Sequence, residues 1–479
     1  MKHLVLMEVG RKQSYIFKSN KLKENIGASM IIQYVTEDLP RNKISSFNGE
    51  EIMRGGGKSL FLFNSESDST KFIKDISEEV LKKFPGLDVY FVKGSLDENN
   101  DNFTDKIEEL YIKLGDKKSL RQNSMKQLSF GIEKICRSTG LPAVYYDKEE
   151  VISEEINSKR NFCDRNTKTS IIKGRENDFP KVLDELKEDD NSYIAVIHID
   201  GNSMGSKFVD LANNYRKLID NDKNYNKIYF EAMNKLSRDI DTVYTKAFNK
   251  VIDESISEGR VTIRPIIFAG DDVTFVCKAE DAIRLSRIFI EEINKNIVNV
   301  GEEEVVLNAA VGVAFVKSHY PFSRAYDLAE ELCSNCKTIL KRSNKDKSMI
   351  DWHILQGESS DSIQEIRKSQ YVAKDTLNLT MRPLYFNDDS EFNSFENFKW
   401  ALNHIQIDEE KNSKISRNKI KTLRGEYTKG IQATNIFIDY YKLGEYFDWF
   451  NKVRCKNGIL QNTAVFFDAI EIMDLVKKV

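Results

Sequence analysis

The sequence contains little cysteine, no excess charge of either sign and no long apolar run. Its 479 residues include six cysteines, which are scattered and lack the grouping of a disulfide framework. The formal net charge is −3 although 31% of residues are charged, so no overall basic excess marks a nucleic-acid coat protein. No apolar run approaches the roughly 18 to 20 residues that span a bilayer. These absences predict a soluble cytoplasmic protein without a membrane partner.

The length of the chain predicts several domains. At about 150 residues per domain, the chain corresponds to roughly three domains. A hydrophobic content of 40% is enough for each to bury its own core. From the order of patterns we expect a first domain at 1–118, a polar linker region at 119–190, a second domain at 191–357 and a C-terminal domain at 358–479.

Two parts of the chain share one order of expected elements. Near the N-terminus the strand HLVLMEVG (His3–Gly10) precedes a helical stretch and then RGGGKSLFLF (Arg54–Phe63). In the middle of the chain YIAVIHIDG (Tyr193–Gly201) precedes helices and then IIFAGDDVTFVC (Ile266–Cys277). Both parts have the pattern of a buried strand, a helix, a strand, a hairpin tip with glycine and a further strand. We therefore predict two copies of one α+β unit, with acids at the second tip only.

The residues after the second hairpin complete a palm-type pattern. Apolar residues of Ala279–Ile297 recur at three- and four-residue spacing, which predicts a helix. A strand, a helix at about 322–341 and a short strand at 349–354 follow. Two such crossings over one mixed sheet form a ferredoxin-like, or palm, arrangement. The predicted fold class is α+β: two ferredoxin-like palm domains plus a C-terminal α-helical domain, in whose core we place the aromatic cluster Tyr440–Phe450.

Three carboxylates are candidate metal ligands. Asp200 ends a buried strand, and Asp271 and Asp272 are neighbours at the tip of the second hairpin. Gly-Asp is also ordinary turn chemistry, so a solvent-exposed β-turn is the alternative. Three acids at one sheet edge repel one another, and a fold that collects them normally compensates with a cation. The pattern therefore predicts a site for Mg²⁺ or Mn²⁺, which can bind triphosphate oxygens and lower the pKa of an attacking 3′-hydroxyl.

A turn that suits phosphate groups follows Asp200. The segment GNSMG opens an expected helix, and the first backbone N–H groups of a helix can bind phosphate oxygens. Glycine permits a close approach of the ligand, both in this turn and at the tip of the second hairpin. The nucleotide-binding candidates of this region are Gly201, Asn202, Ser203, Gly205 and Gly270.

Taken together, several stretches make the chain resemble the large polymerase-cyclase subunit of type III CRISPR effector complexes, or a stand-alone relative built from its two palm domains. The resemblance covers most of residues 1–360 in the family's order, whereas the C-terminal helices match only in type. The matching stretches are YIFKSNKLKENIGAS (Tyr15–Ser29), RGGGKSLFLF, HIDGNSMG, FAGDDVTFVC, GVAFVKSHYPFSRAYDLAEELCSNCK (Gly312–Lys337) and SMIDWHIL (Ser348–Leu355).

The resemblance implies a reaction and roles for individual residues. In that family the second palm domain is similar to GGDEF-like nucleotide cyclases and polymerases, and it joins ATP into cyclic oligoadenylate messengers. Asp200, Asp271 and Asp272 fall inside the matching motifs and would be the catalytic metal ligands. Lys337 stands where related cyclases place a lysine that contacts the triphosphate, although a helix-surface lysine fits the same spacing.

By the same resemblance the first palm domain looks catalytically inactive. Its tip carries glycines and Lys58 in place of acids. In the family this domain borders a second nucleotide pocket, which makes Gly56 and Lys58 nucleotide-binding candidates. A structural glycine turn is the alternative at this tip.

The chain departs from the family in two modules. The zinc module of the family uses paired Cys-x-x-Cys elements, whereas Cys136 and Cys163 each stand alone here, so we expect no structural zinc. Cys333 and Cys336 have ligand spacing but lie on an apolar helix face, and we interpret them as packing residues. The chain begins with the first palm strand and contains no His-Asp dipeptide, so we expect no nuclease domain of the family's metal-dependent type.

Three functions agree with these observations. The first is metal-dependent nucleotidyl transfer from ATP, which gives a cyclic nucleotide signal in antiviral defence. The second is a scaffold that binds RNA within an effector complex, for which the basic stretch Lys411–Gly425 is a candidate contact unless it is a solvated helix face. The third is a regulator that binds ATP without turnover. The expected partners are ATP, and as candidates RNA, other effector subunits and a second copy of the chain.

Overall fold

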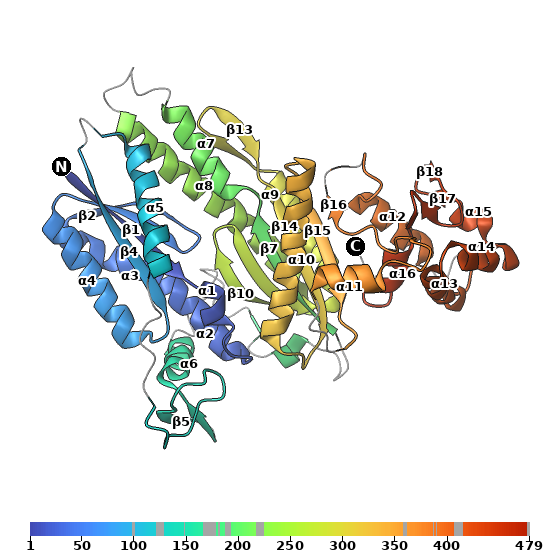
Figure 1. Ribbon diagram of the computed structural model, residues 1–479, viewed down its shortest axis with the longest axis horizontal. Coiled ribbons are helices and arrows are strands. Elements are labelled where there is room, and N and C mark those ends of the chain that lie inside the picture. The colour runs from blue at the N-terminus through green and yellow to red at the C-terminus, as the bar shows by residue number, and fades with distance from the viewer. Residues whose placement is uncertain are drawn as a thin grey trace.

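In the computed structural model two sheet-containing units lie side by side, and a mainly helical region extends from one end (Figure 1). The described helices include none with the length and apolar character that crossing a membrane requires. The structure describes residues 1–97, 101–120, 129–147, 149–165, 179–180, 183–186, 193–216, 225–357, 362–386, 388, 390–406 and 415–476.

The first unit is a four-stranded antiparallel sheet with helices on both faces. Its elements are β1 (Lys2–Gly10), α1 (Lys12–Ile16), α2 (Leu22–Gln33), a π-helix (Tyr34–Asp38), α3 (Leu39–Ile44), β2 (Gly49–Gly55), β3 (Lys58–Phe63), α4 (Glu66–Lys83), β4 (Asp88–Leu96) and α5 (Phe103–Leu120). The strand order is β2-β3-β1-β4. Val5 and Met7 of β1 pack with α4, while Leu4 and Leu6 pack with α5. Because both faces are covered, β1 is apolar at nearly every position.

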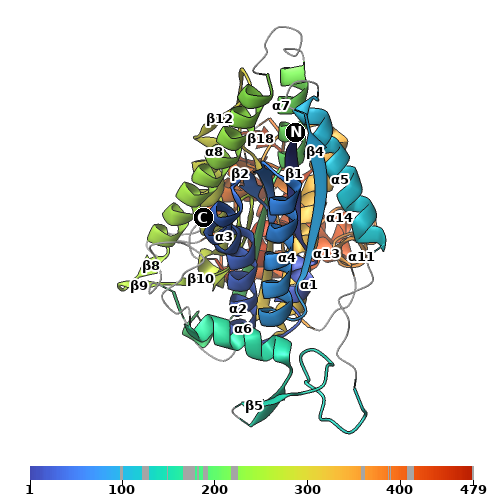
Figure 2. The same cartoon turned by 90° about the vertical axis from the view of Figure 1, so that its left-hand side faces the viewer.

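A small module connects the two units and projects from the lower end of the molecule in both views (Figures 1 and 2). Its described elements are β5 (Tyr145–Asp147), β6 (Glu150–Ile152) and α6 (Glu154–Arg165). Helix α6 packs on α2, where Arg160 forms a 2.6 Å ion pair with Glu24. A Cβ atom on Gly27 would lie 2.1 Å from the carbonyl oxygen of Lys159, so this helix contact requires glycine.

The second unit contains a six-stranded mixed sheet. Its elements are β7 (Tyr193–Gly201), α7 (Met204–Arg216), α8 (Tyr225–Glu254), β8 (Ile256–Ser257), β9 (Arg260–Val261), β10 (Ile263–Ala269), β11 (Asp272–Lys278), α9 (Ala282–Asn294), β12 (Ile297–Val300), β13 (Glu303–Val306), β14 (Ala309–Lys317), α10 (Phe322–Ser343), β15 (Met349–Ile354) and β16 (Leu384–Tyr385). The strand order is β10-β11-β7-β14-β15-β16. Strands β14 and β15 are parallel and are connected by α10. A Cβ atom on Gly312 would lie 1.9 Å from the Ala329 carbonyl oxygen, so α10 rests directly on β14.

The strand register of the two units is the same around the first hairpin of each. In the first unit Lys58 opens β3 and pairs with Glu8 of β1. In the second unit Asp272 opens β11 and pairs with Asp200 of β7. The two units therefore place a different pair of side chains at one equivalent position of the palm fold, which is the internal repeat that the sequence predicts.

The two palm units share their hydrophobic cores. One cluster joins α4 and β1 of the first unit to β7, β10 and α10 of the second, and the other joins β4 and α5 to α8. Helix α8 also packs along β2, where the Ser237 hydroxyl donates to the carbonyl oxygen of Arg54 at 2.5 Å. The hairpin tips of the two units are held in a defined relation by this shared packing.

The C-terminal region is mainly helical and is attached to the second sheet. Its elements are α11 (Ile363–Gln370), α12 (Phe395–Ile405), α13 (Arg417–Lys429), α14 (Ile431–Tyr440), α15 (Gly444–Phe447), α16 (Phe467–Ile472) and the short hairpins β17–β18 (Trp449–Phe450 and Val453–Arg454) and β19–β20 (Ile459–Leu460 and Thr463–Ala464). The prediction that the aromatic cluster forms a helical core is wrong in part. Phe447 and Phe450 are buried, but Tyr440 and Trp449 are 77% and 51% exposed because they lie on the outer side of α14 and in a hairpin.

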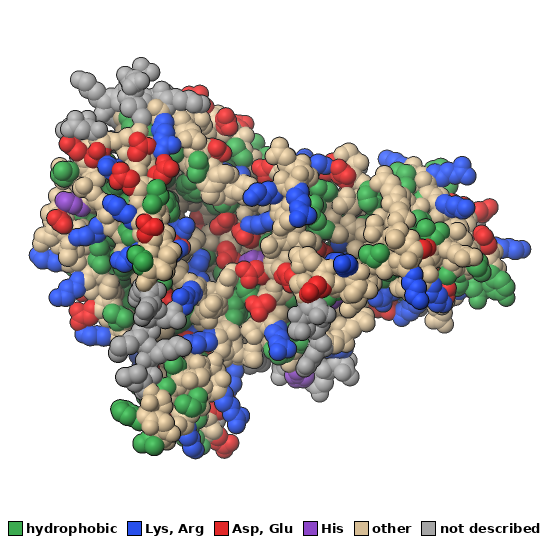
Figure 3. All heavy atoms as spheres, viewed as in Figure 1, with side chains coloured by type: hydrophobic (Ala, Val, Ile, Leu, Met, Phe, Trp, Pro, Cys, Tyr) green, Lys and Arg blue, Asp and Glu red, His purple; other side chains and the backbone are tan. Residues whose placement is uncertain are grey.

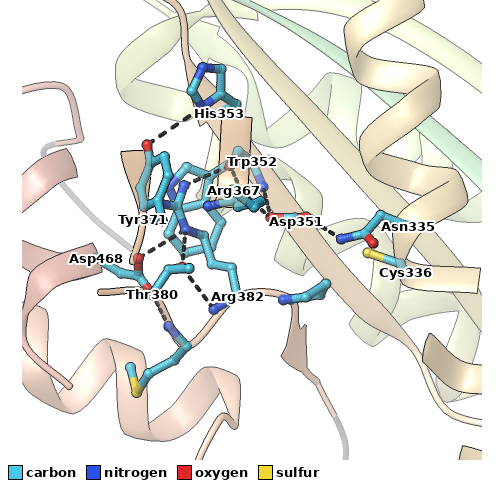
Figure 4. A network of polar contacts seen from close by, with 12 residues as sticks. Asn335, Cys336, Asp351, Trp352, His353, Arg367, Tyr371, Thr380, Arg382 and Asp468 are labelled. Atoms are coloured by element: carbon cyan, nitrogen blue, oxygen red, sulfur yellow. Dashed lines mark hydrogen bonds and ion pairs between the residues drawn. The ribbon is translucent and has the colours of Figure 1, made fainter. Parts of the chain in front are cut away.

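Arg382 joins the C-terminal region to the second sheet through a buried polar network (Figure 4). Its guanidinium donates to the Trp352 carbonyl oxygen of β15 at 2.6 Å and stacks on the Trp352 ring at 4.7 Å. It also pairs with Asp468 at 3.0 Å and with Glu471 at 2.8 Å, both on α16. Because the side chains of Arg382 and Asp468 have no exposed surface, a charge on either requires a buried partner of opposite charge.

Candidate functional site

The three acids that the sequence singles out lie at one edge of the second sheet. Asp200, near the end of β7, is the register partner of Asp272, at the start of β11, and directly opposed side chains in an antiparallel pair share a face. Asp271 precedes Asp272, and its carbonyl oxygen accepts the N–H of Gly201 at 3.2 Å. A Cβ atom on Gly201 would lie 2.9 Å from the Cβ of Asp271, so glycine permits this approach.

The environment of the tip disfavours the charged form of both tip acids. Burial, followed by the charges of Asp200 and Asp272, raises the pKa of Asp271 to about 7. Burial raises the pKa of Asp272 to about 6, with a further contribution from Asp200, although the charges of Lys12 and Lys337 lower it. Carboxylates with raised pKa values at one sheet edge form a site whose charge a bound cation would compensate.

Lys337 of α10 forms an ion pair with one of these acids, Asp200. Its ammonium lies 2.5 Å from Oδ2 of Asp200 and donates to the carbonyl oxygen of Gly201 at 3.0 Å. Lys337 therefore points at the sheet edge that carries the acids, and its contact with a triphosphate stays a prediction. Within the described ranges, no group of three or more His, Cys, Asp or Glu side chains is arranged to hold a metal ion, and at Asp200 the lysine takes the place of a cation.

The donor atoms nevertheless fit a hard divalent cation. Mg²⁺ and Mn²⁺ prefer oxygen ligands, and Asp200, Asp271 and Asp272 supply carboxylate oxygens on one sheet edge. Oδ1 of Asp272 is buried and has no hydrogen-bond partner. Its nearest cationic candidate, Nδ1 of His198, is 3.7 Å away, and burial lowers the pKa of that histidine. A buried carboxylate oxygen without a partner is costly, and metal coordination would satisfy it.

The turn after Asp200 is only partly available for phosphate groups. The backbone N–H of Asn202 donates to the Asn308 carbonyl oxygen at 2.8 Å, and its side-chain amide donates to the Lys347 carbonyl oxygen at 2.8 Å. The backbone N–H of Asn202 is thus committed within the protein, contrary to the expectation that it faces a phosphate. Ser203, with φ of 54°, and Gly205, in the first turn of α7, retain N–H groups that have no partner within the helix.

The hairpin tips of the two palm units approach each other next to the tip acids. A Cβ atom on Gly270 would lie 3.6 Å from the backbone nitrogen of Gly56, so the second tip faces the first. Both glycines have left-handed φ values, 66° and 58°, which explains why glycine stands at the same position of each hairpin. Gly270 and Gly56 are therefore together, as a site between the two palm units requires.

A cavity of about 860 Å³ opens between the two tips and runs along α5, α7 and α8. The space-filling view shows this hollow between the two palm units, with acidic and basic side chains around it (Figure 3). Asp271 and Asp272 line the cavity on one side, and Gly56 and Lys58 on the other. Gly205 also lines it, whereas Asp200, Lys337 and the segment 201–203 lie outside its wall. Its volume is in the range of ligand pockets.

The first palm unit retains a carboxylate–lysine pair at the position of Asp200 and Lys337. Glu8, the register partner of Lys58, pairs with Lys118 of α5 at 2.7 Å. Lys118 is 15 residues after Phe103, which begins α5, and Lys337 is 15 residues after the start of α10. The repeat therefore extends from the strands to the lysine of the last helix, and the first unit differs mainly in the acids of its tip.

The cysteines lie in packed environments. Cys136 is buried in a small cluster with Ile152 and Ile156, and Cys163 is partly buried on α6. Cys333 and Cys336 are buried on α10 and lie near carbonyl oxygens of β14. In the part of the chain that the structure describes, the six cysteines are free thiols.

The basic stretch named above as a candidate RNA contact is largely paired with acids where it is described. Residues 411–414 lie outside the described residues. Arg417 and Lys421 both pair with Asp474, and Arg424 pairs with Glu471 at 2.9 Å. Pairing of this kind favours the interpretation of α13 as a solvated, ion-paired helix face.

Sequence reasoning missed Lys12, which lines the cavity between the units, and Gln13, which connects the first unit to the second. Lys12 lines the cavity, and its ammonium donates to the Gly56 carbonyl oxygen at 2.8 Å. The Gln13 side-chain amide donates to Glu330 of α10 at 2.9 Å. Both residues belong to a short polar segment after β1, which has no periodicity or motif that could mark it.

Comparisons with known proteins agree with this geometry. Residues 193–348 match the family described as Cas10/Cmr2, second palm domain. No curated protein matches the sequence.

Solved structures share the fold over nearly the whole chain. The crystal structure of Csm1 in T. onnurineus is 12% identical with a TM-score of 0.57, and the match covers 99% of this chain and 70% of that chain. The apo Csm1–Csm4 cassette is 13% identical with a TM-score of 0.55 and coverages of 99% and 70%. The Csm1–Csm4 cassette in complex with cA4 is 12% identical with a TM-score of 0.54 and coverages of 99% and 69%. At these identities the likeness establishes the fold.

Proposed function

Because this chain is a Cas10-like palm-domain subunit, we propose that its second palm domain is a metal-dependent nucleotidyltransferase that joins ATP into cyclic oligonucleotides in CRISPR-type antiviral defence. One observation carries the proposal. Asp200 and Asp272 are register partners, and Asp271 and Asp272 line a cavity between two palm domains that is large enough for nucleotides. Solved Csm1–Csm4 cassettes of the same fold contain ATP, AMPPNP, cA3 or cA4, which supports this choice of substrate and product.

The proposed reaction is attack of a ribose 3′-hydroxyl on the α-phosphate of a second nucleotide. A new P–O bond forms, the bond to pyrophosphate breaks, and the hydroxyl loses its proton. Carboxylate oxygens of Asp200, Asp271 and Asp272 would hold Mg²⁺ or Mn²⁺, which when bound polarises phosphate oxygens and lowers the pKa of the hydroxyl. Lys337 would exchange its contact with Asp200 for a phosphate oxygen of the triphosphate.

Other residues orient the substrates. The N–H groups of Ser203 and Gly205 at the start of α7 would donate to phosphate oxygens. Gly270 and Gly56 add no side chains of their own where the tips approach each other, so a nucleotide can come close to both backbones. Lys58, which replaces an acid at the first tip, would face the second nucleotide of the reaction across the cavity.

The experiment that tests the proposal compares the wild-type chain with the double variant Asp271→Asn plus Asp272→Asn. Both are incubated with each of the four nucleoside triphosphates and Mg²⁺ or Mn²⁺, and products are identified by mass spectrometry. The matched control is Glu303→Gln plus Glu304→Gln, two adjacent exposed acids of another hairpin. We expect cyclic products from ATP with the wild type and the control, and none with the aspartate variant.

Two results would point to the other functions. Binding of ATP without release of pyrophosphate by the wild type would indicate a nucleotide-sensing regulator. Salt-sensitive RNA binding together with absence of any product under all conditions, including added RNA, would indicate a scaffold subunit. The same amount of product from the aspartate variant as from the wild type would refute the assignment of the site.

A further inference from the structure

Lys12 belongs to the first palm domain, but its ammonium lies where the two hairpin tips meet. It donates to the Gly56 carbonyl oxygen at 2.8 Å, and the backbone of Gly56 is the part of the first tip that faces Gly270. Lys12 also lines the same cavity as Asp271 and Asp272. Lys12 and the tip carboxylates of the other domain therefore line one cavity, although 260 positions of the chain separate Lys12 from Asp272.

The segment that carries Lys12 is fixed to the second domain. The side-chain amide of Gln13 donates to the Tyr326 hydroxyl at 2.9 Å and to Glu330 at 2.9 Å, and both partners are on α10. The Phe17 ring stacks on the Tyr326 ring with a centroid distance of 3.9 Å. Helix α1 is thus held by the helix that also carries Lys337, so Lys12 keeps its position relative to the second domain.

The glycines of the first tip make room for this lysine. A Cβ atom on Gly57 would lie 2.9 Å from Cδ and 3.2 Å from Nζ of Lys12. Any larger residue at this position would push the ammonium away from Gly56. The sequence allowed two interpretations of the Gly-Gly tip, a nucleotide pocket or a structural turn. The structure adds a third role, because the tip leaves room for Lys12 at the start of α1.

A lysine at this point suits a phosphate ligand. An ammonium group has three N–H donors, and the described contacts of Lys12 commit one of them, to Gly56. When carboxylate-bound cations hold a triphosphate, some of its phosphate oxygens do not contact those cations. A positive charge in the cavity wall would compensate the negative charge of these oxygens. The alternative, that Lys12 serves only to cap the Gly56 carbonyl, does not require a charged residue.

We propose that Lys12 binds the phosphate groups of the nucleotide whose metal ions are held by the carboxylates of the second palm domain. The site is then composite, with Asp271 and Asp272 from one domain and a phosphate-binding lysine from the other. This inference rests on the proposed function, because it assumes that the acids hold a metal–nucleotide complex. Its consequence is that nucleotide binding depends on contact between the two palm domains.

The test measures binding, so that it does not depend on turnover. Full-length wild type, Lys12→Met, Lys12→Arg and the control Lys23→Met are titrated with Mn²⁺-AMPPNP and with AMP by calorimetry, and with Mn²⁺ alone by electron paramagnetic resonance. Lys23 is a lysine of α2 whose exposed pairing with Asp164 lies outside the cavity. We expect Lys12→Met to weaken Mn²⁺-AMPPNP binding about tenfold or more, and Lys12→Arg to restore part of it.

The dependence on phosphate number separates ligand binding from a structural role. If Lys12 binds phosphate groups, Lys12→Met weakens the binding of Mn²⁺-AMPPNP strongly. AMP and Mn²⁺ alone then bind to this variant as they bind to the wild type. Equal weakening of all three, or no weakening of AMPPNP, would overturn the inference while leaving the proposed function intact. Failure of the wild type to bind Mn²⁺-AMPPNP at all would contradict the proposed function and this inference with it.

Discussion

Replacing Lys337 by methionine should change metal binding and nucleotide binding in opposite directions. In the structure its ammonium is 2.5 Å from Oδ2 of Asp200 and 3.0 Å from the Gly201 carbonyl oxygen. A divalent cation that uses Asp200 as a ligand must therefore displace this lysine. Methionine keeps much of the length of the side chain and its packing on α10, but it cannot compete for the carboxylate.

The size of the effect follows from the exposure of the pair. The side chains of Lys337 and Asp200 are 33% and 37% exposed, so solvent screens their attraction. Ion pairs of this kind contribute up to about 1 kcal/mol, which corresponds to about fivefold in an equilibrium constant. We expect Lys337→Met to bind Mn²⁺ about fivefold more tightly than the wild type. Loss of a charge-assisted contact to phosphate should weaken Mn²⁺-AMPPNP about tenfold or more.

The assay uses electron paramagnetic resonance for Mn²⁺ alone and calorimetry for Mn²⁺-AMPPNP, both at pH 8. This pH is above the raised pKa of Asp271, about 7, so protonation of the tip acids does not mask the result. Lys341→Met, which removes an exposed lysine one turn further along α10, is the control. Weaker binding of both ligands to Lys337→Met would refute the view that this lysine competes with the metal.

Three further predictions concern pH, the C-terminal region and the sheet. The affinity for Mn²⁺ should rise with pH between about 5.5 and 7.5 and then level off. The reason is that Asp271 and Asp272, with pKa values of about 7 and 6, must lose protons to bind metal. A titration that finds the same affinity over this range would contradict the pKa shifts. Arg382→Met should destabilise the C-terminal region by about 3–5 kcal/mol, because buried acids lose their cation; unchanged limited proteolysis relative to the surface control Lys399→Met would exclude this. Gly312→Ala should lower the thermal stability in scanning fluorimetry, because its Cβ atom would overlap a carbonyl oxygen of α10, and an unchanged melting temperature would show that the helix shifts freely.

The tip acids also predict a stability effect with a definite sign. Their folded-state pKa values lie above the unfolded value of 3.8, so the folded chain binds more protons than the unfolded chain between about pH 4 and 7. Metal-free stability should therefore fall as pH rises through this window. Asp271→Asn plus Asp272→Asn should melt at a higher temperature than the wild type at pH 8 without metal, and Mn²⁺ should raise the melting temperature of the wild type alone. A lower melting temperature of the metal-free variant would contradict this reasoning.

Local patterns were sufficient for the fold class and for the three acids. Strand, tip and strand are contiguous in each hairpin, so their apolar alternation and glycines can be interpreted without knowing what packs on them. Asp200 and Asp272 each stand at a strand end, and a single β-pairing brings them together. The limits of such reasoning appear at Asn202, whose N–H is committed to Asn308, a residue that no local pattern connects to it.

The amino-acid sequence by itself determined that the protein has two palm units, that both hairpin tips carry glycine and that only the second tip carries acids, because each of these features depends on neighbouring residues. Only the tertiary structure decided that Lys337 contacts Asp200, that Lys12 of one domain lines the same cavity as the tip acids of the other, and that Gly27 and Gly312 are helix contacts. These contacts join segments far apart in the chain. They depend on where the helices cross the sheets. The periodicity of apolar side chains indicates that a face of a helix or strand is buried, but it does not indicate which element packs against that face.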